Sequence, residues 1–240
     1  MLSIFAAQKN MKTLLTTLLV SLASMSLAST SRAESIGHAE FQIGEPWAVL
    51  TSYDTSLTYD NGVLVIPVHN KVFYIPGPDG VPKALLTVSS TETRIPGRVR
   101  WVSEICPDAR PKFFTEDHQS NKQTRVRECL VVNSSFAPLL FYRPDSELAQ
   151  AAKEKGISLF KSGYSFRSVY GANGGALVRV HLATTRAFRG SPTAPESEQL
   201  HDVAPELVAW GEALHAAVRK SASSLSGELV LPAIEFGKSP

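Results

Sequence analysis

The sequence predicts an α+β fold: a mainly antiparallel sheet with a short helix over about 145–156 and a long C-terminal helix over about 202–222, packed on one face. Three observations support this prediction. Segments rich in β-branched and aromatic residues fill the first half of the chain, whereas helical patterns occur only in the second half. Regularly alternating strand and helix patterns are absent, which disfavours a doubly wound nucleotide-binding fold.

Strand character in the first half occurs in four segments, at 47–59, 63–75, 84–92 and 98–106. The first two are joined by Asp60, Asn61 and Gly62, a combination that strongly favours a hairpin turn. The segment 76–80 contains two prolines, which fix φ and cannot donate to a strand ladder. We therefore expect these segments to form an antiparallel meander.

The second half opens with a strand over 124–134 and the short helix over 145–156. Asp145 or Ser146 is the expected N-cap of this helix, because both side chains accept hydrogen bonds from backbone N–H groups. Gly156 is the expected C-cap, since glycine adopts positive φ readily.

A β-hairpin is predicted over 164–184, with its turn at 172–175. In its second arm Arg179 and His181 alternate with apolar residues, so they should share one face of the sheet.

The C-terminal helix is predicted from apolar residues that recur every three or four positions, namely Val203, Leu207, Trp210, Leu214 and Val218. This stripe should lie on the core. The chain then closes with a strand over 228–236, expected at a sheet edge because Pro232 would interrupt a central ladder.

The N-terminus has the pattern of a cleaved signal peptide, so we expect residues 1–33 to be removed and residues 34–240 to form a single domain. Lysines precede an apolar run over about 14–27, which is too short to span a bilayer. Cleavage is expected after Ala28 or Ala33, and translation could begin at Met1 or Met11. The protein should then be periplasmic or secreted, without a transmembrane segment after cleavage.

The net charge of the chain gives no reason to expect a nucleic-acid partner. Residues 1–33 hold three of the 24 Lys and Arg and none of the 22 Asp and Glu, so the mature chain carries a net charge of −1. A near-neutral surface gives no general attraction to phosphate backbones, and we expect no nucleic-acid partner.

The two cysteines, Cys106 and Cys129, are predicted to form a disulfide, because an exported chain with two cysteines usually pairs them. Strand phase places both on the polar faces of segments 98–106 and 124–132, which could be antiparallel neighbours. Such a bond would contribute about 3 kcal/mol. A metal site, a redox pair and a thiol nucleophile remain alternatives, although ligand-spaced histidines and a CxxC motif are lacking.

The same polar faces carry four arginines, Arg98, Arg100, Arg125 and Arg127. If the two segments are neighbours, these side chains form a positive patch that could bind a carboxylate, a phosphate or an acidic protein surface. The alternative is a solvated sheet face with cross-strand charge pairs.

The commonest catalytic motifs are absent from the sequence: it contains no GxSxG, HExxH, Walker A or GxGxxG motif. We therefore expect no cofactor and no metal. The cluster of Glu116, Asp117 and His118 is interpreted as a solvated loop tip, and His215 as a partly exposed helix residue.

These observations favour an exported, non-catalytic domain that binds a protein or an envelope component. Two alternatives remain open. One is a hydrolase whose site is assembled only by the fold, which would require His118 or His181 within reach of a serine or carboxylate in a deep pocket. The other is a small-ligand carrier, which would require a closed apolar cavity under the sheet.

Overall fold

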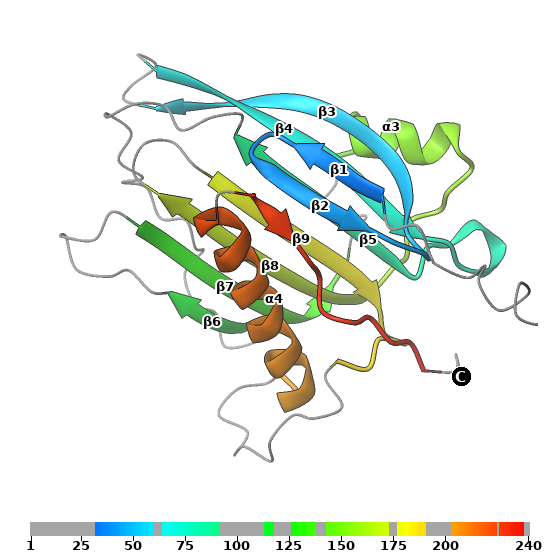
Figure 1. Ribbon diagram of the computed structural model, residues 1–240. Helices are drawn as coiled ribbons and strands as arrows, with labels where there is room; N and C mark the ends of the chain where they lie inside the picture. The colour runs from blue at the N-terminus through cyan, green and yellow to red at the C-terminus, as the bar shows by residue number, and fades with distance from the viewer. Residues whose placement is uncertain are drawn as a thin grey trace, which may run out of the picture. The chain divides into compact units, whose positions relative to one another are not determined.

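The computed structural model describes residues 32–59, 64–91, 113–117, 126–137, 143–172, 177–190, 203–224 and 226–237. It confirms the α+β class, with a mainly antiparallel sheet and a long C-terminal helix on one face (Figure 1). In chain order the elements are β1 (Arg32–Ile36), β2 (Ala39–Ile43), β3 (Ala48–Tyr59), β4 (Leu64–Ile75), the 3-10 turn η1 (Pro78–Gly80), β5 (Ala84–Thr91), β6 (Phe113–Asp117), β7 (Val126–Phe136), α3 (Glu147–Glu154), β8 (Gly163–Ala172), β9 (Leu177–Thr185), α4 (Pro205–Ser223) and β10 (Glu228–Leu229).

The main sheet has seven described strands in the order β3-β4-β5-β9-β8-β7-β6, and every neighbouring pair is antiparallel. The first three strands of the predicted meander are therefore present as β3, β4 and β5, and the predicted hairpin as β8 and β9. The fourth predicted strand, 98–106, lies outside the described residues, and over Ala84–Ser90 the other edge of β5 is paired with β9. A second sheet contains β1, β2 and β10, in which β10 runs parallel to β2. The predicted closing strand is at an edge, as expected, but it covers only Glu228–Leu229.

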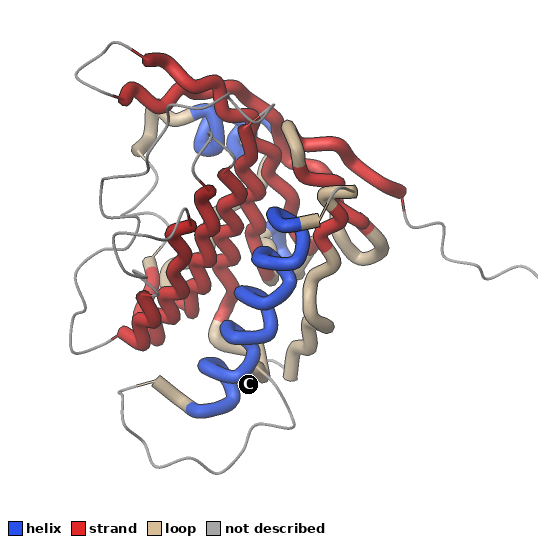
Figure 2. Tube along the Cα trace, turned by 60° about the vertical axis from the view of Figure 1, so that its left-hand side comes forward, coloured by secondary structure: helices blue, strands red, loops and turns tan. Residues whose placement is uncertain are grey.

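One face of the main sheet is covered by α4 and by the small sheet. α4 lies across β7, β8 and β9, whereas β1 lies against β4 and β5 and β10 lies beside β2 and α4 (Figures 1 and 2). The predicted stripe of α4 is buried throughout. The helix begins at Pro205, whose fixed φ suits the first helical position, a few residues later than predicted.

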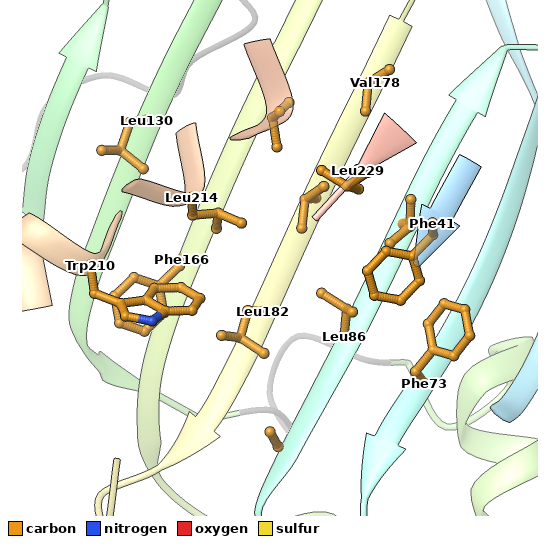
Figure 3. Packing of buried hydrophobic residues seen from close by; sticks show 14 of the residues in the cluster. Phe41, Phe73, Leu86, Leu130, Phe166, Val178, Leu182, Trp210, Leu214 and Leu229 are labelled. Atoms are coloured by element: carbon orange, nitrogen blue, oxygen red, sulfur yellow. The ribbon is translucent and has the colours of Figure 1, made fainter. Parts of the chain in front are cut away.

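The core under α4 is built from aromatic and branched side chains. Trp210 packs against Phe166, with ring centroids 4.8 Å apart (Figure 3), and against Phe188, with ring centroids 5.2 Å apart. Its indole N–H donates to the carbonyl of Ala233 at 2.8 Å. Phe41 of the small sheet packs against Phe73 of the main sheet at 5.0 Å. Hydrophobic burial thus joins both covering elements to the same sheet face.

Close contact between α4 and β7 depends on Gly211. A Cβ atom at this position would lie 2.6 Å from Cγ2 of the buried Val132. Glycine normally weakens a helix, and here it lets the helix backbone approach the sheet.

On the opposite face of the sheet, α3 packs at the β3 end. Leu148 of α3 packs with Leu50, Val72 and Leu85 in a separate, smaller apolar cluster. As predicted, Ser146 caps this helix, its Oγ accepting from the N–H of Ala149 (3.2 Å).

Strand β1 bears on the predicted cleavage point. Its first residue, Arg32, pairs with Ile43, and Ala33 pairs with Gln42. Cleavage after Ala33 would remove both residues from the strand, whereas cleavage after Ala28 would leave β1 whole.

Candidate functional site

The candidate site is a cleft of about 340 Å³ on the sheet face away from α4. We call it the basic cleft. Its lining comes from β3, β4, β5, β8 and β9 and consists of Tyr53, Asn70, Thr87, Ser89, Arg167, Val169, Arg179 and His181.

Strand register explains why these residues meet. Asn70 lies opposite Tyr53 and Ser89, and Ser89 lies opposite Arg179, which gives one row across the sheet. A second row is Thr87, His181 and Arg167. Directly opposed residues of antiparallel strands point to the same face, with Cβ atoms about 5 Å apart. The two rows therefore collect polar side chains on one surface.

The two arginines are diagonal neighbours on β8 and β9, since Arg167 opposes His181 and Arg179 opposes Val169. Within the described part of the chain, neither guanidinium has a hydrogen-bond or ion-pair partner. None of the described lining residues is acidic. The cleft therefore carries two positive charges that the described residues do not neutralise.

The pKa values of the lining residues reflect burial and the two positive charges. Burial, together with the positive charges of Arg167 and Arg179, lowers the pKa of His181 to about 3, so its imidazole is neutral at physiological pH. Desolvation and the neighbouring Arg167 also lower the pKa of Arg179. The pKa of Tyr53 is raised, first by burial and then by Glu147 of α3, against the opposing effect of Arg179.

Chemically, the cleft offers donors without competing carboxylates. Guanidinium groups bind carboxylate and phosphate oxygens through two parallel hydrogen bonds, and hydroxyl groups can supply further donors. The lining also provides the hydroxyls of Thr87, Ser89 and Tyr53. The arrangement suits an oxyanion.

A second cavity, of about 600 Å³, adjoins β1, β3 and β4. Its charged side chains are already paired: His69 Nδ1 lies 2.7 Å from Asp54 Oδ1, and Lys71 Nζ lies 2.6 Å from Glu34 Oε2. Asp54 and His69 oppose each other on adjacent strands, one position along from the Tyr53–Asn70 pair, and so belong to the other sheet face. This cavity thus lacks the unneutralised charge of the basic cleft.

A serine–histidine–glutamate arrangement lies beneath α4. Ser168 Oγ is 2.7 Å from His215 Nδ1, and His215 Nε2 is 3.5 Å from Glu128 Oε2. The order resembles a hydrolase triad. Ser168, however, is 0% exposed and His215 3% exposed, between the sheet and the helix. A substrate cannot reach this hydroxyl, so the group serves to attach α4 to the sheet.

Several predicted residues are placed differently from expectation. His215 is buried rather than partly exposed, because Ser168 gives its ring a partner inside the core. Glu116 and Asp117 belong to strand β6 rather than to a loop tip; His118 lies outside the described residues. Cys129, expected on the polar face of its strand, lies opposite Val169 of the cleft lining and is 0% exposed.

The predicted disulfide and arginine patch fall largely outside the described residues, which include neither Cys106 nor Arg98, Arg100 and Arg125. Arg127 pairs through its backbone with Gly171. Strand β7 lies between β6 and β8, so over Cys129–Asn133 both of its edges are occupied. The expected pairing with segment 98–106 is therefore wrong at these positions, and the Cys106–Cys129 disulfide stays a prediction.

Sequence reasoning missed Arg167 and Arg179 as site residues. The signal was the alternation in the predicted hairpin, which placed Arg179 and His181 on one face. The alternation could not show how β9 pairs with β5, and β5 with β4. That pairing brings Thr87, Ser89 and Asn70 to the same surface.

Comparison with known proteins adds no assignment: no protein-family model, no curated protein and no solved structure matches this chain. Among the described helices, none is long and apolar enough to cross a membrane.

Proposed function

We propose that the protein is an exported, non-catalytic binding protein that holds an anionic ligand in the basic cleft. The observation that carries this proposal is the pair of guanidinium groups, Arg167 and Arg179, on one sheet face with no acidic residue among the described lining. Two neighbouring like charges repel each other, which costs free energy that a bound anion would offset.

Size and polarity support a small ligand or a single group of a larger envelope component. A volume of about 340 Å³ lies at the lower end of the range for small-molecule sites, roughly 300–1,000 Å³. Seven of the eight lining residues are polar, aromatic with a hydroxyl, or charged. A carrier of apolar ligands would need the opposite lining.

A binding role is favoured over hydrolysis by the chemistry of His181. Thr87 lies directly opposite it and could in principle be a nucleophile. A general base works best when its pKa is near the operating pH. With a pKa of about 3, His181 is a weak base at neutral pH, so it would activate a hydroxyl poorly.

Export is the remaining part of the proposal, and it rests on the signal-peptide pattern of the N-terminus. A periplasmic or secreted location would expose the cleft to anionic metabolites and to anionic groups of the envelope. Fractionation of cells that produce the full chain would test this part separately from binding.

The binding experiment compares Arg167→Gln and Arg179→Gln with the matched control Arg143→Gln. Arg143 is exposed and lies outside the cleft lining. Inorganic phosphate, sulfate and acetate would each be titrated calorimetrically, with thermal unfolding as a second readout. We expect at least one anion to bind and stabilise the native protein and the control, and this response to be weaker in both cleft variants. Equal responses in all three variants, or no response to any anion in the native protein, would refute the proposal.

A further inference from the structure

We infer that the basic cleft selects a doubly charged oxyanion, specifically the dianion of a phosphate monoester, over a carboxylate or another monoanion. This inference rests on the proposed function and narrows it to one class of ligand. It is carried by the number, position and pairing of the charged groups that face the cleft.

The first step is the charge of the site. β8 contributes Arg167, and β9 contributes Arg179 and His181, while β3 contributes the phenol of Tyr53. On α3, Glu147 acts on Tyr53 but is not part of the lining. Since His181 and Tyr53 are neutral at pH 7, the described lining carries two charges, both positive. A monoanion would leave one guanidinium uncompensated, whereas a dianion matches both.

The second step is the geometry of the donors. A carboxylate has two oxygens in one plane and is satisfied by one guanidinium fork. A phosphate monoester has three terminal oxygens directed to different sides. The basic cleft has two guanidinium groups, on adjacent strands, and next to them on β5 the hydroxyls of Thr87 and Ser89. Donors that come from three strands suit the phosphate better than the planar carboxylate.

The third step concerns pH. Because the pKa of His181 is about 3, its charge does not change between pH 5 and pH 8. The arginines also stay charged in this range, despite the lowered pKa of Arg179. The free site thus keeps its charge while a phosphate monoester, with a second pKa of about 6, changes from a dianion to a monoanion. Any loss of affinity below pH 6 then reports the ionisation of the ligand.

The experiment uses methyl phosphate and methyl sulfate, which have the same tetrahedral shape but at pH 7.5 carry charges of −2 and −1. Both would be titrated calorimetrically into the purified protein at low ionic strength. We expect methyl phosphate to bind roughly tenfold tighter or more, the factor typical of one additional charge-assisted hydrogen bond. On lowering the pH to 5, its affinity should fall about tenfold, as the dianion becomes the minor species. Inorganic sulfate, which stays a dianion, is the control and should keep its affinity.

Arg167→Gln removes one of the two charges and should bring methyl phosphate and methyl sulfate close to equal affinity, while Arg143→Gln should keep the preference. If Arg167→Gln does not fold, as judged by circular dichroism, Arg179→Gln replaces it, and the comparison in the native protein decides in either case. Equal affinity of the two probes, or acetate binding as tightly as methyl phosphate, would overturn this inference and leave the proposed function standing. Absence of binding by every anion would overturn both.

Discussion

Arg167 and Ser168 are neighbours in strand β8, and they show how the two faces of the main sheet differ. Ser168 points toward α4, where it is fully buried and pairs with His215, which in turn lies near Glu128. Glu128 also accepts a hydrogen bond from Arg219 at 2.6 Å. Arg167 points to the opposite face and has no partner among the described residues. Ser168 and His215 are buried as a hydrogen-bonded pair, because an unpaired buried polar group is costly. The charges without a described partner are found on the other face, in the basic cleft.

The largest expected effect is on the free energy of unfolding, and it tests whether packing between α4 and the sheet stabilises the fold. Trp210→Ala removes an indole that packs against Phe166 and Phe188 and donates to Ala233. We expect a loss of about 3–5 kcal/mol in the free energy of unfolding, measured by urea denaturation. The control Val230→Ala, at a position 53% exposed, should change it by less than about 0.5 kcal/mol. Similar losses for both variants would contradict the packing described for α4.

A smaller effect is expected for the buried polar group on the same face. Ser168→Ala removes the hydroxyl that lies 2.7 Å from His215 Nδ1 and should destabilise the protein by about 1–3 kcal/mol. The double variant with His215→Leu should cost less than the sum of the single changes, because it removes both members of the pair. Anion binding should be unaffected. A loss of binding without a loss of stability would instead indicate that Ser168 belongs to a functional site.

The two faces also differ in how far the sequence predicts them. The buried stripe of α4 and the strands β3, β4, β8 and β9 follow from local periodicity and turn residues, so they were expected. The pairing of His215 with Ser168 could not be predicted in this way. The two residues are 47 positions apart in the chain, and only the packing of α4 on the sheet brings them together.

The basic cleft was unpredictable for a similar reason. Its rows depend on β5 pairing with β9, which are about ninety residues apart in sequence, and nothing in either segment specifies that register. The arginines that the sequence singled out lie in or beside segments outside the described residues. Alternation along β9 did place Arg179 and His181 together, since that relation is local. Strand phase is thus predictable from a sequence, while cross-strand neighbours require the fold.

His181 offers a test of the basic cleft through pH. Its pKa in the folded protein, about 3, lies below the unfolded value of about 6.5. Between these values the unfolded chain binds a proton that the folded protein does not, so stability falls as the pH decreases. From pH 7 to pH 5.5 this residue should cost about 1 kcal/mol. In His181→Gln that part of the pH dependence should vanish, as measured by urea denaturation at both pH values. An unchanged pH dependence would mean that the imidazole titrates normally and is not in the cleft environment described.

The smallest expected effect is a gain in stability, whereas the substitutions above cause losses. It distinguishes the two faces of the sheet most directly. Arg167→Gln removes one of two neighbouring like charges, so without ligand the variant should be as stable as the native protein or more stable, by roughly 0.2–1 kcal/mol. The gain should shrink in 1 M NaCl, where charges are screened beyond about 3 Å. Adding saturating methyl phosphate should reverse the order, because only the native protein gains the full free energy of binding. Thermal unfolding of both proteins, with and without the ligand, would show this crossover. If Arg167→Gln were less stable without ligand by 1 kcal/mol or more, Arg167 would contribute to the fold like the paired groups under α4, and the functional contrast between the two faces would fail.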